Sequence, residues 1–145
     1  VINLKKESEN RGVESSRIIF ADLLSNEEHL SRIKCADLFL DTFNFNAHTT
    51  ASDALWSGVP VITKQGKSFP ARVCSSLLSS LGLEELIVKD DEEYEEKAYS
   101  IASNRKYLDD LKYRLNQSKT ASTLFDTKRF TENLEEIFFK LVKNL

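Results

Sequence analysis

A short apolar run, a polar loop with a helical pattern and a second apolar run most constrain how this chain can fold. Residues 37–42 (DLFLDT) and 59–63 (VPVIT) have the composition of buried strands. The helical pattern between them starts near Thr49, and Gly58 and Pro60 bring it to an end. A strand, a helix and a strand in this order predict a parallel βαβ unit, and such units bind ligands at the carboxyl ends of their strands.

The same alternation extends along the rest of the chain. Further strands are expected in the apolar runs at residues 1–4, 17–20 and 85–89. Helical spacing and end signals predict helices before Gly12, at 25–34, 68–82, 94–102 and 106–117, and from about Phe130, with a loop at 118–125. The sequence therefore predicts an α/β fold. We expect a Rossmann-like parallel sheet with helices on both faces and a helical C-terminal extension over 91–145.

Apolar residues at helical spacing indicate which helix faces belong to the core. The expected core residues of the two central helices are Val73, Leu77 and Leu81, and then Leu108, Leu111 and Leu115. The C-terminal helix carries its own apolar face at Phe130, Leu134, Ile137, Phe138 and Leu141.

Composition limits the classes of protein to which the chain can belong. At 145 residues and 41% hydrophobic, it can bury one core, so we expect a single domain over 1–145. The net charge is −3, and lysine and arginine are scattered, which predicts no nucleic-acid partner. No run approaches the roughly 18 apolar residues of a membrane span, so we expect a cytoplasmic protein without a membrane partner. Cys35 and Cys74 lack metal-ligand spacing, and we expect reduced thiols and no metal.

The loop after residues 37–42 leads into a helix that could hold a phosphate. Thr49 and Thr50 occupy the expected N-cap and first turn, where hydroxyls and free backbone N–H groups point the same way. Helix N-termini of this kind bind phosphate. The loop has no glycine, so Asn44 and Asn46 are expected to supply left-handed backbone in its place. The alternative is that the two threonines form an ordinary helix cap.

The helix at 25–34 presents a second group of polar residues. Ser25 and Glu28 have the spacing of a capping box, which fixes the start of the helix. His29 and Arg32 lie three residues apart and therefore share one face. An imidazole and a guanidinium so placed could sandwich a flat base. A solvated polar face is the alternative interpretation.

One long ungapped stretch resembles a known family. The run HTTASDALWSGVPVIT at 48–63, with KCADLFLDT before it and SFPARVCSSLLSSLGLEELI after it, resembles the catalytic region of the O-linked N-acetylglucosamine transferases. The similarity extends from about Arg17 to the last helix. It is greatest to bacterial members that carry tetratricopeptide repeats upstream.

The resemblance assigns roles to residues of both polar groups. It implies that His48, Thr49 and Thr50 contact the diphosphate and sugar of a UDP-N-acetylglucosamine donor, and that Asp53 binds the ribose. It also implies that the uracil is held by three residues of the other group: Leu24, His29 and Arg32. Asn26 stands where the family often has a lysine, which bears on donor affinity and donor identity.

The family architecture has two Rossmann-like halves, called GT-B, and this chain resembles most of the second, donor-binding half. Residues 1–16 would be an incomplete N-terminal portion of that half. The catalytic base comes from the first half, so no catalytic residue is expected here. The partners implied are the missing first half, tetratricopeptide repeats and an acceptor protein. The implied reaction is a metal-independent inverting transfer to a Ser or Thr hydroxyl.

Two alternatives to the UDP-N-acetylglucosamine interpretation remain open. A relative that uses GDP-fucose would share the same motif and differ in nucleotide preference. A non-catalytic Rossmann-like scaffold would bind nucleotide weakly or not at all, and Asn26 is compatible with that interpretation.

Overall fold

A computed structural model describes residues 1–143, and the last two residues of the expected C-terminal extension lie outside the described part. Its centre is a parallel sheet of three strands in the order β1-β2-β3. These strands are β1 (Phe39–Leu40), β2 (Val61–Lys64) and β3 (Ile87–Val88). The strands β1 and β3 lie within the predicted runs, and β2 extends its predicted run by one residue. All neighbouring strands pair in parallel, so the predicted parallel sheet is confirmed.

Helices cover both faces of this sheet, as the sequence predicts. Successive residues of a strand point to opposite faces, and Val61 and Ile62 of β2 belong to two different core clusters. The Val61 side holds α3 (Thr49–Trp56), α4 (Val73–Ser80) and α6 (Arg105–Ala121). The Ile62 side holds α5 (Asp91–Ser103), through Tyr94. Short 3₁₀ helices, η2 (Phe69–Ala71) and η3 (Glu84–Leu86), flank α4.

The core faces of the central helices are confirmed in α6 and shifted in α4. Leu108, Leu111 and Leu115 are buried. In α4 the fully buried apolar residues are Cys74 and Leu78. Of the three predicted residues, Leu81 is buried just beyond the helix, whereas Val73 and Leu77 are only half-buried. The helix α4 also starts later than predicted, because η2 precedes it and Arg72, not Ser68, is its N-cap.

Two glycines end the helices that flank β2. Gly58 follows α3 with φ +85°, and the N–H of Val59 donates to the carbonyl of Ala54 at 2.9 Å. Gly82 follows α4 with φ +67°, and the N–H of Leu83 donates to Leu78 at 3.0 Å. Both hydrogen bonds are the 6→1 bonds of Schellman motifs, in which the glycine has a left-handed backbone conformation. The predicted helix ends are confirmed.

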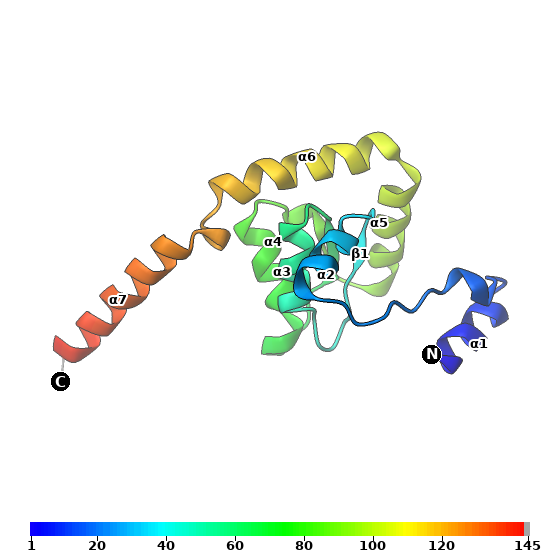
Figure 1. The fold of residues 1–145 in the computed structure, drawn as a ribbon, viewed down its shortest axis with the longest axis horizontal. Helices are drawn as coiled ribbons and strands as arrows, with labels where there is room; N and C mark the ends of the chain where they lie inside the picture. The colour runs from blue at the N-terminus through cyan, green and yellow to red at the C-terminus, as the bar shows by residue number, and fades with distance from the viewer. Residues whose placement is uncertain (144–145) are drawn as a thin grey trace.

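The N-terminal segment differs from the prediction. Residues 1–4 are not a strand, because α1 (Ile2–Asn10) already begins there, and η1 (Ser15–Arg17) follows it. Residues 17–20 are not a strand either, although they are β-branched, and Ile19 is 85% exposed. A strand needs a hydrogen-bonding neighbour, and none lies beside this run in the described chain. Figure 1 shows α1 apart from the α/β unit, joined to α2 (Asn26–Ile33) by an extended segment.

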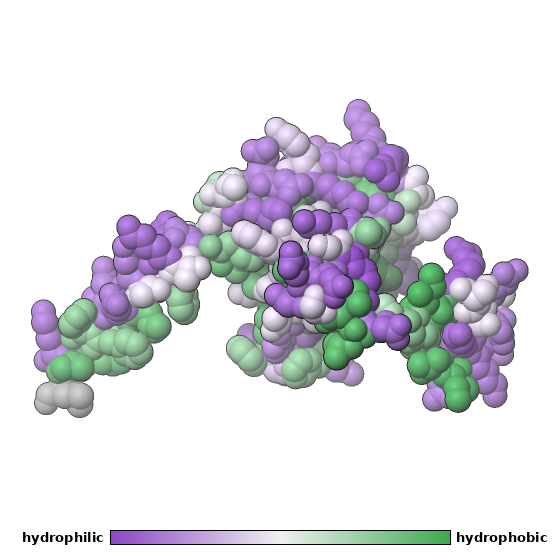
Figure 2. All heavy atoms as spheres, viewed as in Figure 1, coloured by the Kyte–Doolittle hydropathy of each residue, from purple (hydrophilic) through white to green (hydrophobic). Residues whose placement is uncertain are grey.

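The C-terminal part is more helical than predicted. The helix α6 continues to Ala121 and the 3₁₀ helix η4 (Thr123–Phe125) follows, so the loop predicted at 118–125 is wrong. Asn104 accepts a hydrogen bond from the N–H of Tyr107 at 3.1 Å and caps α6. The last helix, α7 (Thr127–Lys143), projects away from the α/β unit (Figure 1). Its apolar side chains lie together along one side and are exposed (Figure 2). No helix of the described residues is long and apolar enough to cross a membrane.

Candidate functional site

A buried carboxylate organises the loop between β1 and α3. Asp41 is only 4% exposed, and its Oδ1 accepts hydrogen bonds from the backbone N–H groups of Thr42 at 2.8 Å and Ala47 at 2.6 Å. Its Oδ2 accepts from the Thr63 hydroxyl at 2.6 Å, which ties the loop to β2. Tyr94 Oη donates to the Asp41 backbone carbonyl at 2.9 Å. No local pattern in the sequence singles out Asp41, because Thr63 and Tyr94 are distant from it in the chain.

Asn46 fixes the second half of this loop. It is 1% exposed, its backbone N–H donates to the carbonyl of Pro70 at 2.8 Å, and its Nδ2 donates to the carbonyl of Thr42 at 2.7 Å. The predicted left-handed backbone at Asn44 and Asn46 is wrong, since only glycines have positive φ in the described chain. The hydrogen bonds to Asp41 and Pro70 shape the turn in its place.

The N-terminus of α3 opens onto a cavity of about 450 Å³ at the carboxyl end of β1. The N-cap is His48, and the predicted N-cap role of Thr49 is off by one residue, because Asp41 holds the N–H of Ala47 and so fixes the chain just before the helix. Thr49 and Thr50 are the first two helical residues, and both are exposed. The His48 side chain does not cap the helix, so its first N–H groups are free for an anion.

His48 lies between two phenylalanine rings. It stacks on Phe45 with ring centroids 4.7 Å apart and planes inclined by 15°. Phe69 meets it edge-on, at 6.3 Å and 83°. His48 Nε2 lies 3.4 Å from the carbonyl oxygen of Pro70. Because a carbonyl only accepts, an N–H at Nε2 can donate in this contact.

A second cavity, of about 550 Å³, lies against α2 and the segment before it. Its lining includes all three predicted uracil residues: Leu24, His29 and Arg32. Arg32 donates through Nη1 to the carbonyl of Asp22 at 2.8 Å, and its Nη2 lies 3.1 Å from His29 Nδ1. Since guanidinium cannot accept, His29 Nδ1 is the acceptor, and the neutral ring carries its proton on Nε2. The shared face of His29 and Arg32 is confirmed.

The start of α2 is the predicted capping box. The Glu28 carboxylate accepts from the Ser25 backbone N–H at 3.1 Å, and the Glu28 N–H donates to Ser25 Oγ at 3.4 Å. The hydrogen bond from the Ser25 hydroxyl lowers the pKa of Glu28. The cap therefore sets the register that places His29 and Arg32 on the cavity.

Asp53 is the predicted site residue that lines neither cavity. It is half-buried on α3, one turn beyond Thr49 and Thr50. The helices α2 and α3 do pack together, and Ser57 Oγ donates to the carbonyl of Leu30 at 3.3 Å. The two cavities are thus carried by neighbouring helices.

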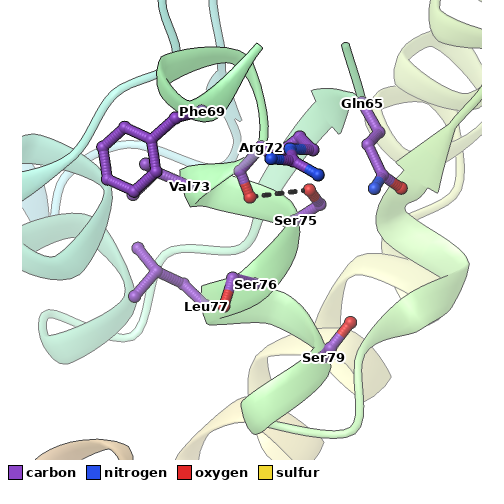
Figure 3. Close-up of a pocket in the computed structure, with 8 residues that line it drawn as sticks. All are labelled: Gln65, Phe69, Arg72, Val73, Ser75, Ser76, Leu77 and Ser79. Carbon is purple, nitrogen blue, oxygen red and sulfur yellow. Dashed lines mark hydrogen bonds between the residues drawn. The ribbon is translucent and has the colours of Figure 1, made fainter. Parts of the chain in front are cut away.

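A third hollow, of about 580 Å³, lies beside η2 and α4, and the sequence does not predict it. Figure 3 shows the side chains that line it, including Phe69, Arg72 and Gln65. The Ser75 hydroxyl donates to the Arg72 carbonyl at 2.9 Å. Val73 and Leu77, which the apolar spacing predicts for the core, line this hollow together with serines of α4.

The described residues 1–143 hold two free cysteines and no close group of metal-ligating side chains. No group of three His, Cys, Asp or Glu side chains is close enough there to hold a metal ion. Cys35 is exposed, Cys74 is buried, and both are free thiols. Burial raises the pKa of Cys74 and keeps it protonated.

Comparison with known proteins decides the family. Residues 2–134 match the model of the family described as Glycosyl transferase family 41. The chain belongs to glycosyl transferase family 41. The similarity to the O-linked N-acetylglucosamine transferases inferred from residues 48–63 and their flanks is therefore confirmed.

Two family 41 relatives illustrate how much of a longer protein the chain matches. It is 44% identical over 132 residues to an Arabidopsis thaliana protein named probable UDP-N-acetylglucosamine–peptide N-acetylglucosaminyltransferase SEC, covering 90% of this chain and 14% of that protein. It is 35% identical over 141 residues to the UDP-N-acetylglucosamine–peptide N-acetylglucosaminyltransferase of Caenorhabditis elegans, covering 97% of this chain and 12% of that protein.

A solved structure shows the same fold within a longer chain. A mutant O-GlcNAc transferase of Thermobaculum terrenum superimposes with a TM-score of 0.86 and 32% identity. The match covers 94% of this chain and 26% of that one. The predicted Rossmann-like α/β fold is confirmed.

Proposed function

We propose that this chain is the donor-binding half of an inverting protein O-glycosyltransferase that moves N-acetylglucosamine from UDP-N-acetylglucosamine to Ser or Thr hydroxyls. The observation that carries the proposal is the free N-terminus of α3, which faces a cavity with His48, Thr49 and Thr50 at the carboxyl end of β1. Parallel sheets bind ligands at this edge. The printed names of the family 41 relatives support the donor and the acceptor class.

The diphosphate would lie against the first turn of α3. Free backbone N–H groups and the positive end of the helix dipole attract an anion there. The hydroxyls of Thr49 and Thr50 are exposed beside these groups and can donate to phosphate oxygens. When the glycosidic bond breaks, negative charge grows on the leaving diphosphate, and preorganised donors stabilise it. The proposal assigns this role to α3 and includes no metal.

The nucleoside would lie along α2 and α3. His29 and Arg32 hold each other by a hydrogen bond, so an imidazole and a guanidinium plane are already fixed at the cavity near Leu24. A flat pyrimidine can stack on such planes and hydrogen-bond with their edges. Asp53, one turn into α3, would accept from the ribose hydroxyls. Asn26 lines the same cavity as Leu24, and it contributes no charge to the site.

Catalysis requires residues beyond this chain. The chain spans 12% of the length of the C. elegans relative and 14% of the A. thaliana one. We propose that a first Rossmann-like half supplies the catalytic base and that tetratricopeptide repeats upstream bring the acceptor protein. The chain alone would bind donor and would not transfer the sugar.

Nucleotide affinity tests the donor-binding proposal. Phosphorus NMR of UDP and of GDP, titrated with the chain, reports binding at the phosphates. We expect UDP to bind with a Kd on the order of 1 mM, as suits an isolated half-site. Thr50→Ala and Asp53→Ala should each raise the Kd for UDP by about three- to tenfold, which corresponds to the loss of one hydrogen bond.

The matched control for these variants is Thr131→Ala on the exposed face of α7. Thr131 bonds only to its own helix, so the variant should bind UDP like the wild type. Preference for GDP would favour a GDP-fucose enzyme instead. Absence of binding to either nucleotide would contradict the donor-binding role and favour a scaffold domain.

A further inference from the structure

We propose that a hollow between the end of α6 and the start of α7 is a docking site for an acidic peptide segment of a partner protein. This hollow has a volume of about 810 Å³, and its lining includes Lys34, Trp56, Lys119 and Arg129. It lies where the chain turns from α6 through η4 into α7 (Figure 1). It shares no lining residue with the two cavities of the donor site, so the proposal goes beyond the function proposed above and does not depend on it.

The hollow lies at the opposite end of α3 from the proposed phosphate site. The helix begins with Thr49, which lines the cavity at the carboxyl end of β1, and ends with Trp56, which lines the hollow. The eight residues of α3 span about 12 Å. The two sites are therefore separated by the whole length of the helix.

Three cations gather at this hollow. Lys34 is the C-cap of α2, Lys119 lies in the last turn of α6, and Arg129 lies in the first turn of α7. The helix dipole favours the two lysines at helix C-termini, but it disfavours Arg129 at a helix N-terminus. Among the described residues, none of these three side chains forms an ion pair. The carboxylate of Asp126, which also lines the hollow, already accepts the backbone N–H of Arg129 at 3.0 Å.

The lysines of the hollow repel each other in the free chain. Burial and, as a second cause, the positive charge of Lys34 lower the pKa of Lys119. Carboxylates of a partner would relieve this repulsion. The chain as a whole carries a net charge of −3, so the hollow is a positive site on an acidic protein. Such a charge distribution steers an acidic partner to the hollow and away from the rest of the surface.

An exposed indole provides an apolar contact beside these charges. Trp56 is 54% exposed, and Phe125 supports it edge-on with ring centroids 5.2 Å apart. Lys119 Nζ donates to the Trp56 carbonyl at 2.8 Å and lies 5.8 Å from the centre of the indole. Tryptophan and arginine are enriched among the residues that dominate protein–protein binding energies. An apolar contact flanked by cations fits a peptide in which carboxylates flank an apolar side chain.

Hydrogen bonds fix one wall of the hollow before a partner binds. Ser122 Oγ donates to the carbonyl of Ser80 at 2.8 Å and accepts the N–H of Leu124 at 3.0 Å. Leu124 and Phe125 also pack against the larger core cluster. The 3₁₀ helix η4 is thus joined to α4 and to the core. A wall that is already ordered lowers the entropy cost of binding.

Tryptophan fluorescence reports on this site directly, because Trp56 is the only tryptophan of the chain. The probe is the peptide Glu-Glu-Leu-Glu-Glu, blocked at both ends and titrated into the whole chain at low salt. We expect a saturable change in emission with a Kd on the order of 0.1 mM. Because salt screens exposed charges, the Kd should rise by about tenfold or more at about 0.5 M salt.

Two further peptides separate the contributions of charge and of the apolar side chain. The peptide Gln-Gln-Leu-Gln-Gln removes the carboxylates, and Glu-Glu-Ser-Glu-Glu removes the apolar side chain. Each should bind at least about fivefold more weakly than the probe, because each lacks one of the two kinds of contact. Saturating UDP should not displace the probe, since the donor cavities are separate from the hollow.

Variants of exposed cations place the probe in the hollow. Lys34→Gln and Arg129→Gln should each raise the Kd for the probe by about three- to tenfold, through the loss of one charged contact. Lys128→Gln is the matched control, because it removes the same charge from the neighbouring exposed residue of α7, which does not line the hollow. This control should bind the probe like the wild type.

Four results would overturn the proposal. They are a probe that causes no saturable change in fluorescence, a neutral peptide that binds as tightly as the acidic one, a control variant that weakens binding as much as Arg129→Gln does, and displacement of the probe by UDP. A thymidine oligonucleotide of equal charge that binds more tightly than the probe would also overturn it, and would assign the hollow to nucleic acid.

Discussion

At the scale of single residues, buried side chains fix the shape of the loop before α3. Asp41 holds two loop N–H groups and the Thr63 hydroxyl, and Asn46 bridges the loop to Pro70. The sequence indicates His48, Thr49 and Thr50 because they form a local motif. It cannot indicate Asp41, because the bond from Thr63 that explains its burial spans 22 positions. The local motif at the start of α3 is thus visible in the sequence, and the buried residues that support it are not.

Tyr94 provides a pH-dependent test of how the core holds this loop. Burial, with a smaller effect of the Asp41 carboxylate, raises the pKa of Tyr94 to about 12. In the unfolded chain the tyrosine pKa is about 10. Above about pH 10 the unfolded state therefore binds fewer protons than the folded state, and the free energy of unfolding falls as pH rises from 10 to 12. The contribution of the protonated Tyr94 side chain to the free energy of unfolding is fully present below pH 10.

Urea unfolding of wild type and Tyr94→Phe at several alkaline pH values checks this prediction. The stability difference between the two proteins should be constant below pH 10 and should shrink by about 2 kcal/mol towards pH 12. Other tyrosines and lysines titrate in both proteins and cancel in the comparison. A difference that stays constant through this range would show that Tyr94 ionises at its ordinary pKa.

At the scale of elements, the sequence predicts helix caps and helix ends correctly, because these depend on residues close together in the chain. It predicts strands less well, because a strand also depends on pairing with another segment. The capping box of α2 and the glycine ends of α3 and α4 involve residues within one or two turns, and all are predicted. The run at 17–20 has the composition of a strand and is not one, because strand formation needs a paired partner. The predicted start of α4 is misplaced because η2 intervenes before it.

Gly58 tests the contribution of a helix end to the whole unit. Its φ of +85° disfavours any residue with a Cβ, and a Cβ there would lie 3.2 Å from Asn116 Oδ1 of α6. Gly58→Ala should lower the free energy of unfolding by about 1 to 2 kcal/mol from backbone strain, with the contact adding to it. Urea denaturation midpoints measure the change.

The comparison variant for Gly58→Ala is Gly82→Ala. Gly82 has φ +67°, and a Cβ at this position would meet open space, so this variant carries the backbone strain without a contact. Gly82→Ala should therefore lower the free energy of unfolding by less than Gly58→Ala does. Equal midpoints for both variants and the wild type would refute the left-handed geometry at these helix ends.

At the scale of the whole molecule, a compact α/β unit carries two projecting ends. The unit has its own core, built on the three strands and on α3, α4, α5 and α6. The helices α1 and α7 extend from it, and α7 has an exposed apolar face (Figures 1 and 2). The sequence predicts the amphipathic pattern of α7. It cannot predict the separation of α7 from the core, because periodicity identifies an apolar face without identifying what covers it.

Removal of α7 should therefore leave the α/β unit almost unchanged. Deletion of residues 127–145 is expected to alter the free energy of unfolding by less than about 1 kcal/mol, because apolar residues of α7 such as Phe138 and Leu141 are exposed. Urea unfolding measures this, and binding of a hydrophobic dye should fall. Deletion from residue 105 onward is the contrast, since it removes the buried Leu108, Leu111 and Leu115 and should abolish cooperative folding. A loss of several kcal/mol on removing 127–145 alone would mean that α7 is part of the core.

The most direct test of the central claim is one titration of the isotope-labelled chain with UDP, followed through its backbone amide resonances. The donor-binding account predicts that Thr49 and Thr50 at the start of α3 and His29 on α2 shift along one saturable curve, with a Kd on the order of 1 mM. A common curve would mean that one molecule of nucleotide spans both cavities. Shifts confined to other parts of the chain, or amides of α3 that do not respond to saturating UDP, would contradict the account.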